Sequence, residues 1–289
     1  MATAEDAYYI PHGTKWPIVG SVGLTLLVSG FAAMLNGSEV GNTVMLIGVA
    51  VVIFMMFGWF GTVIRESESG TYNPQVDVSF RWGMGWFIFS EVCFFAAFFG
   101  ALFYSRIYSV PWLGGEGVGG ISTHEFLWPN FDAVWPTNGP EKIGGIYETV
   151  GAWGIPAINT AVLLSSGVTV TLAHWAILKS KRTAFIAWLF ATVALGFFFV
   201  VLQAYEYSHA YTDLNLTLES GVYGSTFYML TGFHGFHVTM GAIILLVVML
   251  RAMKGHFTAD SHFAFEAAAW YWHFVDVVWL GLFIFVYWF

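Results

Sequence analysis

Cysteine and charged residues are both scarce in this chain of 289 residues. The single cysteine, Cys93, excludes a disulfide framework, a paired-thiolate copper or zinc site and an iron–sulfur ligand set. Only 10% of the residues are charged, with 10 Lys and Arg against 18 Asp and Glu. With so few bases, no nucleic-acid partner is expected. No internal repeat is evident, which counts against a transporter built from two duplicated halves.

Apolar and aromatic residues dominate what remains. The chain is 57% hydrophobic and holds 29 Phe and 14 Trp, which is far above the content of a soluble domain. This composition predicts a polytopic membrane protein. Residues 1–15 are short and polar and resemble neither a secretory signal peptide nor an Arg-rich transit peptide.

Seven apolar stretches have the roughly 20 residues that a membrane helix needs. They predict an all-α membrane protein with spans at about 16–35, 43–64, 81–108, 153–178, 183–207, 223–253 and 262–289. A polar connection at 65–80 separates the first two spans from the rest, so we expect an N-terminal two-helix bundle at 1–64 and a five-helix bundle at 81–289. The longest loop, 109–150, is rich in Gly, Pro and Trp.

Lys and Arg predict the orientation of these spans. With seven spans, the N-terminus and every second loop share one side of the membrane, which holds eight of the ten bases: Lys15, Arg65, Arg81, Lys179, Lys181, Arg182, Arg251 and Lys254. Arg106 and Lys142 fall on the other side. Basic loops stay on the cytoplasmic or matrix side, so the N-terminus is expected there and Phe289 in the opposite compartment. The acidic outer face is interpreted as a solvated loop, with a binding surface for a cationic partner as the alternative.

The most unusual stretch runs from Phe265 to Trp279 inside the last span. It carries Glu266, His273 and Asp276, groups that are costly in hydrocarbon. At 3.6 residues per turn these three lie on one helix face. A lipid-facing helix would not carry such a stripe, so we expect it to face protein.

Other ionisable residues lie at similar depth. Glu91 falls about ten residues into the third span, and His234 and His237 enter the sixth span from the opposite side by a similar distance. With His273 and Asp276 they could form a layer near the midplane. Glu206 and His209 lie near the outer end of the fifth span.

These residues allow three interpretations. Glu206-Tyr-Ser-His209 has the Glu-x-x-His spacing of di-iron bundles, but the second such motif is missing from the sequence. A proton relay through Glu91, His273 and Asp276 would need more stations than this one cluster. The favoured interpretation is interhelical hydrogen bonding, worth about 0.6 kcal/mol per bond in a membrane. This seam comprises His234, Glu206, His209, Glu266, His273 and Asp276. No metal site and no catalytic residue are expected in the chain.

Several long motifs resemble subunit III of cytochrome c oxidase, in the haem–copper oxidase subunit III family. They are Phe89-Ser-Glu-Val-Cys-Phe-Phe95, Leu202-Gln-Ala-Tyr-Glu-Tyr207, Gly221-Val-Tyr-Gly-Ser-Thr-Phe227, Thr231-Gly-Phe-His-Gly-Phe-His-Val238 and Phe265–Leu280. The resemblance covers essentially all of spans 2–7. The first span and the loop at 109–150 are not diagnostic. Tyr72-Asn73-Pro74 departs from the family pattern, which puts a lipid phosphate contact at that position in doubt.

The resemblance implies that spans 1–2 lean away from spans 3–7 around a V-shaped cleft filled with phospholipid. It implies a non-redox accessory subunit of a proton-pumping oxidase that reduces O₂ with electrons from cytochrome c. The chain would pack beside catalytic subunit I, in a complex with subunit II. Haem and copper would lie in those partner subunits. The subunit would stabilise subunit I against turnover-linked inactivation and support proton uptake.

The resemblance also assigns site residues. Glu91 falls on the family's carbodiimide-reactive membrane glutamate. The cleft-lipid region of the family falls on Trp59, Phe60, Arg65, Glu66, Ser67 and His237. Arg251 and Lys254, at the cytoplasmic end of the sixth span, are suited to phosphate head groups.

Two other functions fit a polytopic membrane protein less well. The homologous subunit of a quinol oxidase or nitric oxide reductase commonly has fewer spans, and an independent channel or transporter would be expected to show broken midplane helices. The lack of a transit peptide and the long outer loop favour a bacterial aa3-type oxidase in the inner (plasma) membrane, with a periplasmic C-terminus. The mitochondrial inner membrane is the alternative, because organelle-encoded subunits also lack presequences.

Overall fold

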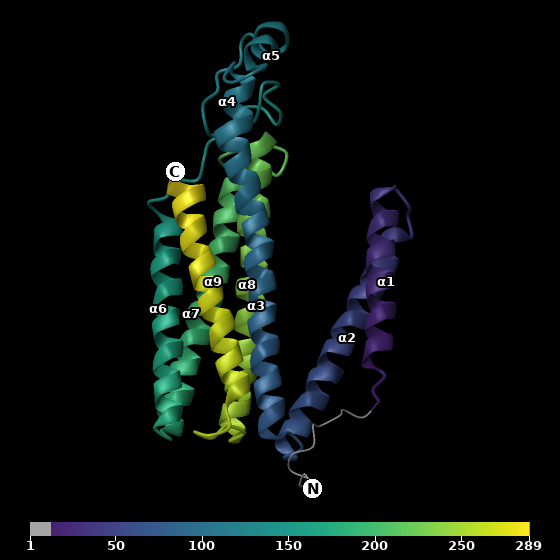
Figure 1. Cartoon of the computed structure of the whole chain (residues 1–289), viewed down its shortest axis with the longest axis vertical. Helices are drawn as coiled ribbons and strands as arrows, with labels where there is room; N and C mark the ends of the chain where they lie inside the picture. Colours follow the sequence, from purple (N-terminus) through teal and green to yellow (C-terminus); the bar gives the residue numbers. More distant parts are fainter. Residues whose placement is uncertain (1–12, 289) are drawn as a thin grey trace. The chain divides into compact units, whose positions relative to one another are not determined.

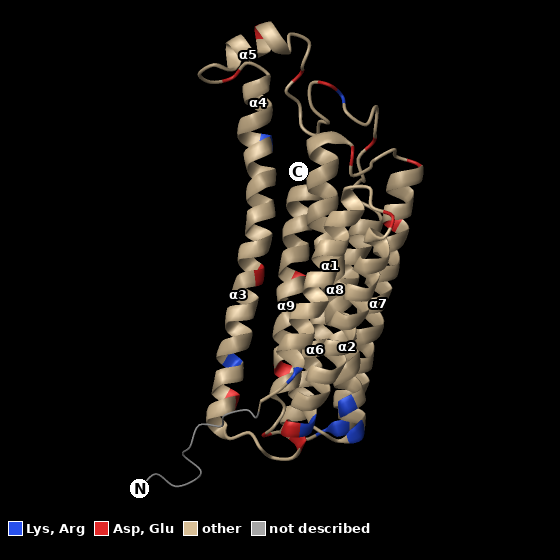
Figure 2. Ribbon diagram, turned by 90° about the vertical axis from the view of Figure 1, so that its right-hand side faces the viewer, with Lys and Arg blue, Asp and Glu red and all other residues tan. Residues whose placement is uncertain are grey.

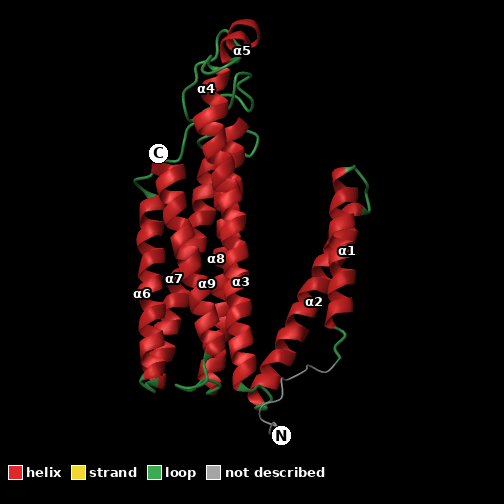
Figure 3. Ribbon diagram, in the orientation of Figure 1, coloured by secondary structure: helices red, strands yellow, loops and turns green. Residues whose placement is uncertain are grey.

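A computed structural model describes residues 13–288, and within this range every regular element is a helix (Figure 3). Seven of the helices, counting α3 together with its continuation to Leu113, are long and apolar enough to cross a membrane. The seven-span all-α prediction is therefore confirmed. The elements are α1 (Trp16–Leu35), α2 (Gly41–Glu68), α3 (Pro74–Tyr104), η2 (Ser105–Ser109), α4 (Val110–Leu113), α5 (Gly120–Leu127), α6 (Ile155–Leu178), α7 (Arg182–Thr212), α8 (Gly221–Lys254), α9 (Phe263–Leu282) and η3 (Phe283–Trp288).

The helix ends follow local sequence rules. Proline lies in the first turn of α1 and α6 and is the first residue of α3, where its missing N–H costs nothing. Helix α8 ends at Gly255, whose φ of 85° is readily reached only without a Cβ atom. Helices α6 and α7 are joined through the short Lys179–Lys181 turn, in which Ser180 has a φ of 54°.

The helices extend beyond the apolar spans. Helix α2 continues to Glu68 and α3 begins at Pro74, so the polar connection expected at 65–80 is mostly helical and only 69–73 link the two helices. Charged residues such as Asp77 and Arg81, which bond each other at 2.7 Å four positions apart, are compatible with a helix outside hydrocarbon. The expected loop at 109–150 likewise contains α4 and α5. The length of an apolar stretch therefore indicates the part of a helix that crosses the membrane, and not where the helix begins and ends.

Contacts divide the chain into two compact units, Met1–Trp82 and Gly83–Phe289, and each is described by itself. In the first unit α1 and α2 pack closely through glycines. A Cβ atom on Gly30 would meet the backbone of Met45, and one on Gly48 would meet the backbone of Leu27. Close approach at small residues is a usual way to associate membrane helices, because no hydrophobic effect drives association in lipid.

The second unit is built on α6, α7, α8 and α9, with the greater part of α3 beside them (Figure 1). Its core is aromatic. The indole N–H of Trp272 donates to Ser166 Oγ at 2.8 Å, and that of Trp279 donates to Thr160 Oγ1 at 2.9 Å. Both indoles are fully buried and tie α9 to α6. The outward positions remain apolar, as for Phe190 and Val201 on α7, which suits hydrocarbon.

Charge separates to the two ends of this unit. The α6–α7 turn and the end of α8 carry the bases Lys179, Lys181, Arg182, Arg251 and Lys254. Figure 2 shows basic residues gathered at the end of the bundle that lies away from α4 and α5, whereas acidic residues predominate around those two helices. Arg182 donates to the carbonyl oxygen of Met253 at 2.6 Å, which ties the start of α7 to the end of α8.

Candidate functional site

A short contact between side chains of α3 and α8 joins Glu91 to His237. Glu91 Oε2 lies 2.7 Å from His237 Nε2, although the two residues are 146 positions apart in sequence. Both side chains are mostly buried, at 19% and 10% exposed. The ring of Phe95 packs against the imidazole at 5.1 Å, and Tyr271 donates its hydroxyl to the His237 carbonyl at 3.4 Å. An aromatic shell thus surrounds one acid–base pair within the span.

The hydrogen bonds of His237 fix how many protons the pair holds. Its Nδ1 lies 2.6 Å from the Phe233 carbonyl oxygen, which can only accept, so Nδ1 carries a proton. The 2.7 Å contact between Nε2 and Glu91 then needs one further proton. This proton lies either on the carboxyl group or on Nε2, and the pair is neutral overall in both cases. Net neutrality is the state that a low-dielectric environment tolerates.

His234, one turn earlier on α8, has a different partner. Its Nε2 donates to the carbonyl oxygen of Val275 on α9 at 3.2 Å, and its ring packs against Trp279 at 5.1 Å. The residue is 1% exposed. His234 therefore links α8 to α9, whereas His237 links α8 to α3.

Glu206 lies in a second buried cluster, near the C-terminal end of α7. Its Oε1 accepts a hydrogen bond from the Tyr287 hydroxyl at 2.6 Å and one from Gln203 Nε2 at 3.2 Å. His209 lies apart from this cluster, because its Nδ1 bonds Asp213 at 2.6 Å at the exposed end of the same helix. That bond lowers the pKa of Asp213 below its ordinary value. The sequence did not point to Tyr287 and Gln203, because neither side chain ordinarily carries a charge.

Potential metal ligands converge where α6 ends and α9 begins. Glu266 Oε1 lies 3.2 Å from His262 Nε2 and 3.6 Å from His174 Nε2. The three ligand atoms lie within 4.8 Å of one another, and imidazole with carboxylate suits zinc and other first-row ions. Among residues 13–288 this is the group that could hold a metal ion. The His-x-x-x-Glu spacing of His262 and Glu266, one helical turn, was an available signal that the sequence analysis did not use.

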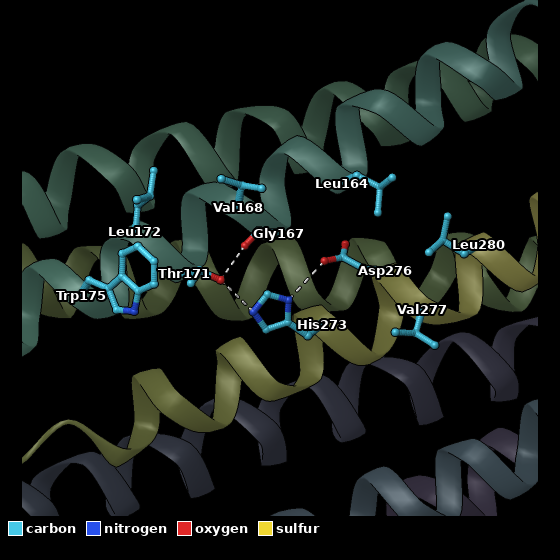
Figure 4. A pocket seen from close by; sticks show the side chains of 10 residues that line it. All are labelled: Leu164, Gly167, Val168, Thr171, Leu172, Trp175, His273, Asp276, Val277 and Leu280. Atoms are coloured by element: carbon cyan, nitrogen blue, oxygen red, sulfur yellow. Dashed lines mark hydrogen bonds and ion pairs between the residues drawn. The ribbon is translucent and has the colours of Figure 1, made fainter.

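The residues first weighed as metal ligands do not converge. Glu206 and His209 bond different partners, and His234 and His237 face α9 and α3 respectively. His273 and Asp276 lie on the other side of α9, against α6, in the groove of Figure 4. The expected single layer is therefore divided among three places in the bundle.

The residues assigned to lipid are mostly exposed. Trp59 and Phe60 are 49% and 55% exposed, and their ring centroids lie 6.3 Å apart. Arg65 donates to Thr62 Oγ1 at 3.3 Å, and Ser67, two residues later, is exposed. Glu66 accepts a bond from the Tyr72 hydroxyl at 2.8 Å. In the other unit the Arg251 guanidinium lies 4.7 Å from the centroid of the Phe257 ring, and Lys254 is exposed. His237 differs, because both of its ring nitrogens already have partners.

Comparison with known proteins gives the family of the chain. The family model for cytochrome c oxidase subunit III matches residues 6–289. The chain belongs to the cytochrome c oxidase subunit III family. It is 40% identical to cytochrome c oxidase subunit 3 of Carassius auratus, 41% to that of Gadus morhua and 40% to that of Hippopotamus amphibius. Each match covers 100% of this chain and 99% of the relative.

Membership of the subunit III family gives the polar groups a context. The family's members are accessory subunits of a proton-pumping oxidoreductase complex, and the redox centres of the oxidase are not held in this subunit. The buried acid–base pairs therefore lie in a multi-pass membrane subunit that works in an assembly.

Proposed function

We propose that the chain packs directly beside the haem- and copper-bearing catalytic subunit I, within an oxidase that also contains subunit II and accepts electrons from cytochrome c. It stabilises subunit I during turnover, holds structural phospholipid and supports proton uptake. The observation that carries the proposal is the Glu91–His237 pair, a buried and neutral acid–base pair in a subunit family without redox centres. Such a pair locks α3 to α8 without doing redox chemistry.

Lipid binding is proposed for two groups of residues. Arg65 follows the exposed rings of Trp59 and Phe60 by between one and two turns of α2, and a cation near aromatic residues at a helix end is typical of the membrane–water interface. Arg251 and Lys254 offer cations at the end of α8, where anionic phosphate groups are attracted. For His237 we propose a supporting role, because its nitrogens bond Glu91 and Phe233.

The location follows from the basic loops. We propose that the N-terminus and the α6–α7 and α8–α9 connections face the cytoplasm or matrix. A bacterial plasma membrane was favoured by the sequence, and the relatives reported above come from animals, so the mitochondrial inner membrane is the competing location. The family match favours a cytochrome c oxidase over the alternative parent complexes, a quinol oxidase or a nitric oxide reductase.

One experiment tests the parent complex. The chain is purified with an affinity tag from mild detergent, and the visible spectrum and subunit composition of the product are recorded. A haem spectrum with cytochrome c oxidation activity is expected. A haem complex that oxidises quinol but not cytochrome c would favour the alternative, and a colourless isolated chain would overturn the proposal.

A second experiment tests the lipid sites. Phospholipid retained by the purified complex is counted by native mass spectrometry for Arg251→Ala and Lys254→Ala. The matched control is Lys142→Ala, which removes a base from the loop on the opposite side. Loss of phospholipid is expected for the first two changes alone. Equal retention in all three would remove these residues from the lipid site.

A further inference from the structure

Four core residues of the five-helix unit carry buried side-chain atoms that have no hydrogen-bond partner in the described part of the chain. The atoms are Nδ2 and Oδ1 of Asn159 on α6, Oε1 of Gln203 and Oε2 of Glu206 on α7, and Nδ1 of His234 on α8. These residues are 0, 5, 1 and 1% exposed, in that order. Because buried polar groups are nearly always paired, this set needs an explanation.

The packing around Trp272 of α9 shows which residues of the four helices lie at one level. Its indole N–H donates to Ser166 of α6 at 2.8 Å. A Cβ atom added to Gly196 of α7 would meet the indole at 2.7 Å, and one added to Gly241 of α8 would meet it at 2.9 Å. Each of the four helices therefore contributes one residue to a layer, which we call the Trp272 layer.

A second layer follows two helical turns away. Seven residues advance a helix by about 10.5 Å and return nearly to the same face. Since consecutive spans alternate in direction, the step goes backward on α6 and α8 and forward on α7 and α9. It leads from the members of the Trp272 layer to Asn159, Gln203, His234 and Trp279. We call this set the Trp279 layer.

Contacts of the Trp279 ring support this assignment on α6 and α8. The ring centroid lies 5.1 Å from that of the His234 imidazole. The indole N–H donates at 2.9 Å to Thr160, which is the neighbour of Asn159 in sequence. Asn159 and His234 therefore lie at the level of Trp279.

The same holds on α7. Phe199 packs against Trp279 with ring centroids 4.7 Å apart, and Gln203 follows Phe199 by one turn. Gln203 Nε2 donates to Glu206 Oε1 at 3.2 Å, and Tyr287, whose ring centroid lies 5.8 Å from that of Trp279, donates to the same oxygen. The five unpartnered atoms thus belong to one polar level of the bundle.

These atoms need a ligand that both donates and accepts hydrogen bonds. His234 Nδ1 is an acceptor, because Nε2 donates to the Val275 carbonyl, and Gln203 Oε1 is an acceptor too. Asn159 Nδ2 is a donor. A metal cation would occupy acceptors but leave this N–H group unpaired, and an acyl chain would pair with none of them. Water can do both.

We propose that ordered water binds in the Trp279 layer and joins α6 to α7 and α8. One molecule accepts from Asn159 Nδ2 and donates to Gln203 Oε1 and His234 Nδ1. These are the about three hydrogen bonds that a buried water usually makes. A second molecule serves Asn159 Oδ1 and Glu206 Oε2. The site lies within one unit of this chain, so the inference does not depend on the identity of the parent oxidase.

Electron cryomicroscopy of the intact complex, at a resolution that shows ordered water, tests the site. The expected result is density about 2.7–3.2 Å from at least two of the five polar atoms. The Trp272 layer is the control in the same map. Its indole already bonds Ser166 and its other two positions are glycines, so density for water is not expected there.

Three results would overturn the inference. The first is a direct hydrogen bond from Asn159 Nδ2 to Gln203 or His234 with no water density between them. The second is density about 2.0–2.6 Å from several acceptors, which is the range for a bound cation. The third is equal water density in both layers, which would show that water enters the bundle without these polar side chains.

A variant of Asn159 gives an independent readout. Asn159→Leu keeps the branched shape but removes the amide, so it is expected to abolish the water density and to lower the midpoint of thermal unfolding by several degrees. Replacing an amide that truly lacked a partner would stabilise the fold instead. An unchanged or raised midpoint would therefore count against bound water. Ser165→Ala, on the exposed face of α6, is the control and should leave both density and midpoint unchanged. If Asn159→Leu does not assemble, the map of the unchanged complex decides.

Discussion

Glu91 Oε2 and His237 Nε2 lie 2.7 Å apart and share one proton between α3 and α8. The backbone carbonyl of Phe233 fixes the tautomer by accepting from Nδ1 at 2.6 Å. The pair is a hydrogen-bonded link between two helices rather than one step of a proton relay, because aromatic rings fill its surroundings. These rings belong to Tyr271, Phe95 and Phe94.

The Glu91–His237 hydrogen bond predicts different results for two changes at Glu91. Glu91→Gln keeps a donor for Nε2, so initial oxidase turnover is expected to stay near that of the unchanged complex. Glu91→Ala leaves a buried nitrogen unpaired and is expected to destabilise the subunit by about 1–3 kcal/mol. Oxygen consumption in the first turnovers and thermal unfolding of the subunit are measured. Loss of most activity at the first turnovers of Glu91→Gln would instead indicate a direct role in proton transfer.

Two adjacent serines on α6 provide an internal comparison. Ser166 accepts from the buried indole of Trp272 at 2.8 Å, whereas the exposed Ser165 bonds only the Ala161 carbonyl of its own helix. Ser166→Ala is expected to lower the free energy of unfolding by about 1–3 kcal/mol, because the indole N–H is left unpaired. Ser165→Ala is the control and is expected to change it by less than about 0.5 kcal/mol. Equal effects would show that the interhelical bond contributes nothing.

The number of helices could be predicted from sequence because the membrane imposes a minimum apolar length. The fifth span, expected at 183–207, corresponds to α7 at Arg182–Thr212. The pairing of polar residues could not be predicted in the same way. Counting residues places Glu91 and His273 at similar depth, but depth does not give the rotation of each helix. Rotation directs Glu91 toward α8 and His273 toward α6.

Spacing along one helix predicts a hydrogen-bonding partner correctly for Glu266 but not for His209. Glu266 meets His262 one turn before it and His174 from α6, and the first of these contacts follows from spacing alone. His209 shares a helix with Glu206, yet its bond to Asp213 keeps it at the exposed end. The lipid-filled cleft expected from the family resemblance stays a prediction.

Tyr147, in the loop before α6, and Tyr228, near the start of α8, are expected to respond oppositely to loss of the hydroxyl. The Tyr147 oxygen is buried without a hydrogen-bond partner among the described residues, whereas Tyr228 donates to the Leu216 carbonyl at 2.6 Å. Tyr147→Phe should leave the free energy of unfolding unchanged or raise it, and Tyr228→Phe should lower it by about 1 kcal/mol. Chemical denaturation measures both.

Burial raises the pKa of Tyr147 from 10.0 to about 12. The folded chain therefore keeps a proton that the unfolded chain loses, so the contribution of this phenol to stability is complete below pH 10.0 and is lost as the pH rises toward about 12. Tyr147→Phe should remove that part of the alkaline loss. An unchanged alkaline profile in the variant would contradict the burial argument.

Variants of Glu206 can show whether its cluster needs a hydrogen-bond acceptor or a negative charge. Tyr287 and Gln203 both donate to Oε1, so the cluster needs an acceptor at that position rather than a charge. Glu206→Gln retains a carbonyl acceptor and should cost less than about 1 kcal/mol, whereas Glu206→Ala orphans the Tyr287 hydroxyl and should cost about 1–3 kcal/mol. Tyr287→Phe in the Glu206→Ala background should then cost little more, since the hydroxyl has already lost its partner. Thermal unfolding of the unchanged chain, Glu206→Ala, Tyr287→Phe and the double variant gives the coupling energy, and strictly additive losses would show that the two side chains act independently.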